Sequence, residues 1–406
     1  MSYVIKAVLS NARHPEHGQV TVPFPISEKE YDRTMEELGA LEIGNTLNQD
    51  SQVDDLDSFY SVLKRLEGSN VTLDELDYLA KRLDSFGEEE SAQFQGMAHK
   101  LGLNDIRDFI NLTFCCRQAT VITDFSNLEA VGRSHFLNLN GSGAKMEELE
   151  NLDGAETALL LIDGGGEAVT PYGVVYDNGM KLEQLYNGRQ FPGYLYGDCI
   201  MGVEVKVKCA QSEGQIPELL CLSTSEKQIE RMLLRAGVED PNDISDVEMS
   251  LEYDTLPTQI TEMLDMRCES PGTLNALCHA IAGLSETEQK KLGAVVLMAG
   301  PCCADEVREL AENLEQFDFV PNIQTSEEYG RYMIRESGHF EYDENLESFY
   351  DYRRYGEQQV RQEGGQFNEC GYVAYHGTMT LEELMRVDPA EMYRLEQGPQ
   401  MGGQSW

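Results

Sequence analysis

Ser27-Glu28-Lys29-Glu30-Tyr31-Asp32-Arg33 returns 198 positions later as Ser225-Glu226-Lys227-Gln228-Ile229-Glu230-Arg231. Each stretch predicts the first turns of an amphipathic helix. A serine opens it, and Glu30 or Gln228 follows three residues later, which is the spacing of a capping box. Gly39 and Gly237 follow at the distance of a helix end, so we expect them to close the two helices.

The repetition continues along most of the chain. Thr72-Leu73 is matched by Thr273-Leu274, Val131-Gly132-Arg133 by Tyr329-Gly330-Arg331, and Val174-Val175-Tyr176 by Val373-Ala374-Tyr375. The separation stays close to 200 residues throughout, which is domain size and far above the ~20–50 residues of solenoid repeats. The pattern predicts two tandem homologous halves, residues 1–200 and 201–396, followed by a disordered tail, 397–406.

Hydrophobic periodicity and turn residues predict an α+β fold, in which each half is a small sheet with a helical cluster and the whole is elongated and acidic. In the first half the pattern predicts strands at 3–9 and 19–24, a polar connection at 40–53, and helices at 55–66, 72–84, 88–100, 103–113 and 126–136. Residues 156–163 fit a helix or a strand, and Asn178-Gly179 predicts a hairpin between 171–177 and 181–186. In the second half it predicts strands at 202–208 and 217–223, and helices at 258–266, 273–284, 286–298 and 305–317.

The charge of the chain limits its partners. It has 72 acidic and 31 basic residues among 406, a formal net charge of −41. Such a field repels nucleic acid and acidic membranes and attracts basic protein surfaces. There is neither a basic leader nor an apolar run long enough to span a bilayer, so we expect a soluble, cytoplasmic protein that does not bind nucleic acid or membranes directly.

No side-chain pattern predicts catalysis. His14 and His17 form an H-x-x-H pair, but the pair falls in an expected turn, which favours solvated loop residues over a metal site. The vicinal cysteines Cys115-Cys116 and Cys302-Cys303 favour packing over redox chemistry. Gly132-Arg133 and Gly330-Arg331 occur in both halves, which favours a role in the fold. We therefore expect a protein without enzymatic activity, cofactor or metal, and keep a hydrolase with paired carboxylates as a minor alternative.

The acidic helix faces carry the functional prediction. In 305–318, Val307, Leu310 and Leu314 form an apolar face, and acidic residues occupy the other side roughly 4–6 Å apart along the axis. Like charges at this spacing repel each other, so the row costs helix stability. A row of carboxylates on a rigid scaffold can imitate the charges of a DNA backbone, so this face permits a DNA mimic. The predicted partner-binding residues are Asp305, Glu306, Glu309, Glu312, Glu315, Glu327, Glu328, Glu336, Glu341, Asp343, Glu344 and Glu347.

Three segments resemble ArdA-type antirestriction proteins: Ile26–Tyr31, Leu73–Leu83 and Phe109–Leu112. The chain is most similar to long ArdA-like proteins of Gram-positive conjugative elements. The resemblance implies a DNA mimic that occupies the basic DNA-binding groove of a type I restriction-modification enzyme, protects incoming mobile DNA, and forms homodimers. The alternative is an acidic binding module for another basic DNA-associated protein. Competition with duplex DNA for a type I enzyme distinguishes the two.

Overall fold

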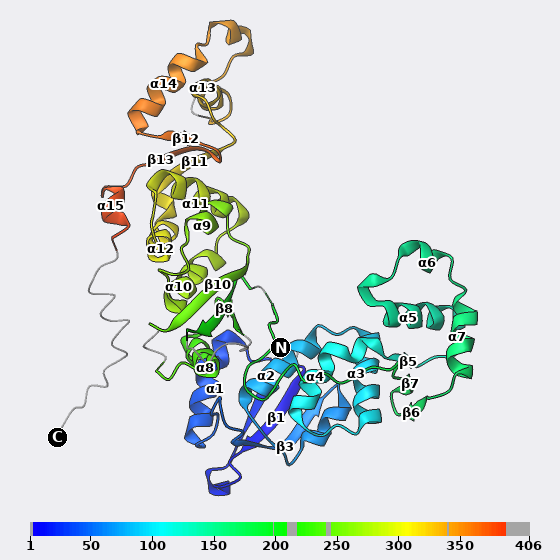
Figure 1. The fold of residues 1–406 in the computed structure, drawn as a ribbon. Helices are drawn as coiled ribbons and strands as arrows, with labels where there is room; N and C mark the ends of the chain where they lie inside the picture. Colours follow the sequence, from blue (N-terminus) through cyan, green and yellow to red (C-terminus); the bar gives the residue numbers. More distant parts are fainter. Residues whose placement is uncertain (1–2, 198, 209–216, 241–244, 339–340, 387–406) are drawn as a thin grey trace, which may run out of the picture. The chain divides into compact units, whose positions relative to one another are not determined.

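The computed structural model describes residues 3–197, 199–208, 217–240, 245–338 and 341–386 (Figure 1). The chain forms two compact units. Unit 1 comprises residues 1–196, 205–219 and 225–247, and unit 2 comprises residues 197–204, 220–224 and 248–406. The predicted tail, 397–406, lies outside the described residues.

The first series of elements begins with a hairpin and a helix and ends with two short strands. Its members are β1 (Ile5–Ser10), η1 (Pro15–His17, a 3-10 turn), β2 (Gln19–Phe24), α1 (Glu28–Ala40), β3 (Ser51–Ser58), η2 (Ser61–Leu66), β4 (Asn70–Val71), α2 (Leu73–Asp84), α3 (Glu88–Leu101), α4 (Ile106–Cys115), η3 (Cys116–Gln118), β5 (Thr120–Ile122), α5 (Leu128–Asn140), η4 (Gly141–Gly143), α6 (Met146–Glu150), α7 (Gly154–Asp163), β6 (Ala168–Thr170) and β7 (Gly173–Tyr176). They form one sheet of strand order β2-β1-β3-β4 and another of order β5-β7-β6.

The second series follows the same plan. Its members are β8 (Met201–Val207), β9 (Glu218–Leu222), α8 (Glu226–Ala236), β10 (Val247–Asp254), α9 (Thr258–Met263), α10 (Pro271–Ala282), α11 (Glu286–Ala299), α12 (Ala304–Glu312), η5 (Leu314–Gln316), β11 (Phe317–Pro321), α13 (Ser326–Arg335), η6 (Glu344–Phe349), α14 (Tyr352–Glu363), β12 (Gln366–Asn368) and β13 (Gly371–Tyr375), before a short α15 (Leu381–Leu384). The strand orders are β10-β8-β9 and β11-β13-β12, which correspond to β3-β1-β2 and β5-β7-β6.

The two series keep a constant separation. Helices α2, α3 and α4 start at Leu73, Glu88 and Ile106, and helices α10, α11 and α12 start 198 positions later at Pro271, Glu286 and Ala304. Strands β6 and β12 differ by the same 198 positions, from Ala168–Thr170 to Gln366–Asn368. The structure thus places α10 three residues earlier than the predicted match of Thr72 to Thr273. Thr72 caps α2, whereas Ser270 caps α10 and Thr273 lies inside it.

The core of unit 1 follows from strand alternation and helix periodicity. Ile5, Ala7 and Leu9 alternate along β1 and are fully buried, because successive side chains of a strand point to opposite faces. Leu76, Leu79, Ala80 and Leu83 cover the same core from α2, whose start is fixed by the predicted capping box of Thr72 and Glu75. Burial of these side chains is the main force that holds the strands and helices together.

Two helix pairs pack through glycine. A Cβ atom on Gly132 in α5 would lie 1.8 Å from the carbonyl oxygen of Gly154 in α7. In the other series a Cβ atom on Gly330 in α13 would lie 1.9 Å from the carbonyl oxygen of Tyr352 in α14. Neither site has room for a side chain, so the predicted fold role of Gly132 and Gly330 is confirmed.

Several local predictions were wrong. Residues 55–58 belong to β3 and not to a helix, and residues 181–186 are not in a strand, because β7 pairs with β6 on its other side. Residues 156–163 are helical, within α7. Ser27 makes no side-chain capping bond, and Gly39 lies inside α1, whereas Ser225 forms the full capping box and Gly237 closes α8 in the left-handed conformation.

Candidate partner-binding surface

Helix α12 carries the first group of predicted acidic residues. Val307, Leu310 and Leu314 are buried as predicted, so this side of the segment faces the core. An arginine lies within the acidic row. Arg308 Nη2 lies 2.7 Å from Glu309 Oε1, and Arg308 Nε lies 3.8 Å from Asp305 Oδ1. Asp305 and Glu309 are half-buried and paired with a cation, which removes much of the repulsion expected for the row.

Glu306 also has an internal role. Its Oε2 accepts a hydrogen bond of 2.6 Å from the backbone N–H of Cys302, just before α12. Glu269 Oε1 accepts from the backbone N–H of Ala304 at 2.9 Å. The first amides of a helix have no partner within the helix, and Glu269 satisfies the first one of α12. Glu306 instead fixes the residue before the N-cap, and the positive end of the helix dipole stabilises both carboxylates.

Three acidic residues around helices α13 and α14 are engaged within the fold. Glu328 completes the capping box of Thr325 at the start of α13. Glu327 lies 3.3 Å from Arg331 Nη2. Glu347 in η6 accepts hydrogen bonds from Tyr342 and Tyr352 and forms an ion pair with Arg335. The hydrogen bonds from Tyr342 and Tyr352, with help from Arg335, lower the pKa of Glu347 to about 2.

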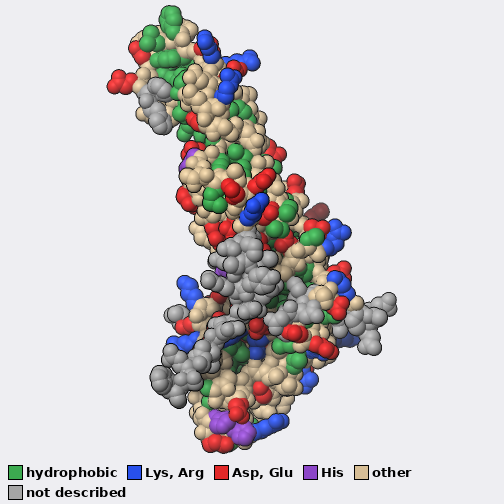
Figure 2. Space-filling view, turned by 90° about the vertical axis from the view of Figure 1, so that its left-hand side faces the viewer, with side chains coloured by type: hydrophobic (Ala, Val, Ile, Leu, Met, Phe, Trp, Pro, Cys, Tyr) green, Lys and Arg blue, Asp and Glu red, His purple; other side chains and the backbone are tan. Residues whose placement is uncertain are grey.

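The other predicted acidic residues are exposed. Asp343 accepts a hydrogen bond from the backbone N–H of Asn345 at 2.9 Å and so caps η6. We call the remaining five the solvent-facing carboxylates: Glu312, Glu315, Glu336, Glu341 and Glu344. Acidic side chains are spread over the face of the molecule in Figure 2, with basic ones among them. The structure therefore separates carboxylates that hold the fold from carboxylates that are open to a partner.

A buried ionic cluster in unit 1 was not predicted. Arg231 and Arg235 extend from α8 toward Asp74 in α2, and Arg235 Nη1 lies 3.1 Å from Asp74 Oδ1. Arg235 Nε lies 3.4 Å from Glu218 Oε1, and the Arg235 guanidinium stacks over the Phe191 ring at 5.2 Å. The i,i+4 spacing of two arginines beside the apolar Met232 and Leu233 is the sequence signal that could have indicated this cluster.

The two acids of this cluster respond to pH in opposite directions. Burial alone would raise the pKa of Asp74, but Arg235 and Arg231 outweigh it and lower that pKa. Asp74 therefore contributes stability above the usual aspartate pKa of about 3.9, which is lost as the pH falls through its lowered pKa. Burial raises the pKa of Glu218 more than Arg235 lowers it. Its contribution is complete at low pH and is lost as the pH rises through the raised pKa.

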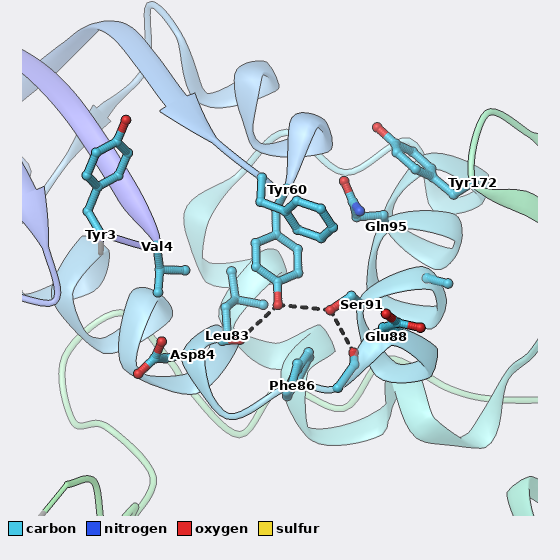
Figure 3. Close-up of a pocket in the computed structure, with 13 residues that line it drawn as sticks. Tyr3, Val4, Tyr60, Leu83, Asp84, Phe86, Glu88, Ser91, Gln95 and Tyr172 are labelled. Atoms are coloured by element: carbon cyan, nitrogen blue, oxygen red, sulfur yellow. Dashed lines mark hydrogen bonds between the residues drawn. The ribbon is translucent and has the colours of Figure 1, made fainter. Parts of the chain in front are cut away.

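An aromatic cavity of about 480 Å³ opens beside α3 in unit 1 (Figure 3). Tyr60 Oη donates to the Leu83 carbonyl oxygen at 2.8 Å and lies 3.0 Å from Ser91 Oγ. Gln95 lines the cavity and is 7% exposed, and among the described residues its Oε1 has no hydrogen-bond donor. Because Ser91 Oγ donates its proton to the Gly87 carbonyl oxygen and not to a base, this arrangement does not indicate a nucleophile.

Part of the second series matches one known protein family. Residues 217–374 match the family described as Antirestriction protein (ArdA). This range runs from just before β9 to β13 and contains every predicted partner-binding residue. The chain thus has an ArdA-type region, which supports an antirestriction role and confirms the resemblance for residues 217–374. The segments that suggested it lie in the first series, outside the match.

No curated protein matches the chain. Within the part of the chain that the structure describes, every helix is too short or too polar to cross a membrane.

Proposed function

We propose that this protein inhibits a type I restriction-modification enzyme in the cytoplasm by occupying its basic DNA-binding groove. The observation that carries the proposal is the match of residues 217–374 to antirestriction proteins. The same range carries the solvent-facing carboxylates. On this proposal the protein protects incoming mobile DNA, acts by binding alone, and itself binds no nucleic acid.

The surface suits binding through many weak contacts. A net charge of −41 favours approach to a basic groove. Each exposed ion pair contributes only about 0–1 kcal/mol, so affinity must come from several carboxylates together. Those already paired with Arg308, Arg331 or Arg335 have less to offer, because their charge is partly compensated. We therefore assign the main role to the solvent-facing carboxylates.

We also infer that the first series is a second, diverged copy of the ArdA-type unit. The support is the constant separation of 198 positions between α2 and α10, between α3 and α11, and between β6 and β12. The matched strand orders of the sheets add to it. Independent insertions in two unrelated domains would not keep such a separation.

Competition against DNA tests the proposed function. The complete chain is titrated into a complex of duplex DNA and a type I methyltransferase core, and it should displace the DNA less well as salt rises. Replacing Glu312, Glu315 and Glu336 together by lysine should weaken displacement by about tenfold or more, because three contacts of up to ~1 kcal/mol become repulsive.

The control for this experiment carries the same change in net charge. Glu147, Glu148 and Glu150 on α6 are exposed, and their triple replacement by lysine should weaken displacement less. Equal losses would show that net charge, and not the predicted surface, governs binding. No displacement by the unaltered chain, or displacement indifferent to salt, would contradict the proposal and leave another basic protein as the target. Sedimentation in the same buffer tests the homodimer that the resemblance implies.

A further inference from the structure

The turn between β1 and β2 is held by several hydrogen bonds and a proline. Asn11, which is buried, donates from Nδ2 to the Leu41 carbonyl oxygen at 3.0 Å and accepts from the Arg13 backbone N–H at 3.0 Å. The His14 backbone N–H donates to the Asn11 carbonyl oxygen at 3.0 Å, and Pro15 begins the 3-10 turn η1. Proline fixes its own φ and restricts the backbone of the residue before it, here His14.

This turn brings three metal-ligating side chains together. One ligand atom from each of His14, Glu16 and His17 lies within 4.8 Å of the other two. The imidazole rings of His14 and His17 are stacked, with centroids 5.1 Å apart and an interplanar angle of 13°. His14 Nδ1 lies 3.1 Å from Glu16 Oε1.

His17 also has the outer partner that metal-bound histidines usually have. Its Nδ1 lies 3.5 Å from the Leu41 carbonyl oxygen, so an N–H at Nδ1 points to that acceptor and leaves Nε2 for a metal. Such a carbonyl fixes both the tautomer and the orientation of a ligating imidazole. Leu41 is the residue to which Asn11 also donates, so one backbone carbonyl supports both the turn and the ring.

We propose that His14, Glu16 and His17 form a binding site for a divalent transition-metal ion such as Zn²⁺. Two imidazoles and one carboxylate suit Zn²⁺, Ni²⁺ or Cu²⁺, whereas Ca²⁺ and Mg²⁺ prefer oxygen ligands alone. All three residues are exposed, so the ion is reached directly from solvent. Three protein ligands leave a fourth position for water or for a side chain of a partner.

The site belongs to one series only. The positions 198 residues later in the sequence are Ser212, Gly214 and Gln215, none of which is an imidazole or a carboxylate. Metal binding would therefore be a property that distinguishes the first series from the second. It is also separate from the predicted partner-binding residues, which all lie between 305 and 347.

Calorimetric titration of the complete chain with Zn²⁺ tests the proposal. Cys302, Cys303 and Glu306 form a second group of possible ligands, so the background protein carries Cys302→Ser and Cys303→Ser. We expect one equivalent of Zn²⁺ that is lost in the double variant His14→Ala, His17→Ala. Glu16→Gln should weaken binding at least about tenfold, because it removes a carboxylate ligand, and loss of an outer partner alone commonly costs about 10–100-fold. His376→Ala, at another exposed histidine, is the matched control and should bind as the background does.

A second measurement locates the ion. Paramagnetic Cu²⁺ added to isotope-labelled protein should broaden the amide signals of residues 11–18 first. Unchanged stoichiometry and affinity in the double variant would overturn the proposal, and so would broadening that begins elsewhere. Circular dichroism of each variant should match the background protein, because the altered side chains are exposed.

Discussion

Helices α1 and α8 start from nearly the same heptapeptide, yet they end in different environments. Arg33 in α1 is exposed, its side chain 79% accessible, and pairs with Glu37 one turn away. Arg231, 198 positions later in α8, is 9% accessible and binds the carboxylate of Asp74. The local sequence determines that a helix forms, and the neighbour against which it packs determines whether the same arginine contributes to stability.

The two helices nevertheless share one anchor. The backbone N–H of Ile26 donates to Asp77 Oδ1 at 2.8 Å before α1, and the backbone N–H of Thr224 donates to Asn275 Oδ1 at 2.9 Å before α8. Both acceptors occupy the fifth position of the following long helix, α2 or α10. Both series thus have the backbone contact before the helix, whereas only α8 has the buried ion pair of Arg231 with Asp74.

The largest expected effect is the loss of stability when the buried Arg231 is replaced, compared with replacement of the exposed Arg33. Arg231→Met should destabilise unit 1 by about 3 kcal/mol, because removing one partner of a buried ion pair leaves a poorly compensated charge. Arg33→Met, its counterpart, should change stability by less than about 0.5 kcal/mol. Hydrogen exchange of α8 and α2 measures both variants. Equal protection in the two would show that the buried pair adds nothing to stability.

The next effect tests the glycine contacts that both series share. Gly330→Ala should cost about 2–3 kcal/mol, since overpacking against backbone forces α13 and α14 apart. Gly132→Ala should have a similar effect on α5 and α7. The control is Gly39→Ala in α1, where a Cβ atom meets open space and alanine should stabilise the helix by about 0.5–1 kcal/mol. Hydrogen exchange of the helices that carry each glycine measures the effect. Equal exchange rates in the three variants would contradict the close backbone contacts at Gly132 and Gly330.

The smallest expected effect is the loss of stability when the first serine of α8 or of α1 is replaced. Ser225→Ala should lower stability by about 1 kcal/mol, because it removes the oxygen that accepts from the Gln228 backbone N–H. Ser27→Ala should be close to neutral, since Ser27 makes no such bond. Exchange of the first-turn amides of α8 and α1 provides the measurement. A matching loss at Ser27 would mean that its hydroxyl caps α1 in solution.

Much of the helical fold could be predicted from sequence, while several strands, among them β3 and β10, could not. Helices α2 and α3 combine a periodic apolar face with a polar start, and both were predicted to within a residue or two. Strand β3 was missed because its buried apolar residues, Val53 and Leu56, are three apart. The register of β3 against β1 shifts between Val8 and Leu9, which breaks the alternation that marks a strand.

The exact alignment of the second series on the first also could not be predicted from the sequence pattern. Thr72-Leu73 matches Thr273-Leu274 in letters, but α10 begins one turn earlier. A shift of three residues keeps the same face of a helix apolar, so periodicity could not detect it. At the candidate surface the apolar side of α12 was predicted correctly. The engagement of Asp305 and Glu309 by Arg308, and of Glu347 by Tyr342 and Tyr352, depends on contacts that spacing alone does not reveal.

The ionic cluster of Arg231, Arg235, Asp74 and Glu218 has a consequence for the history of the gene. On the inference of an ancestral duplication, α8 and α2 belong to different copies. Now α8 from the second copy lies in the same compact unit as α2 from the first. If the gene were divided between codons 200 and 201, one product would contain Asp74 without its two arginine partners. The other product would contain Arg231 and Arg235 without Asp74. On that inference, dividing the gene would separate the partners of a buried ion pair, so the folding of unit 1 now requires segments of both copies.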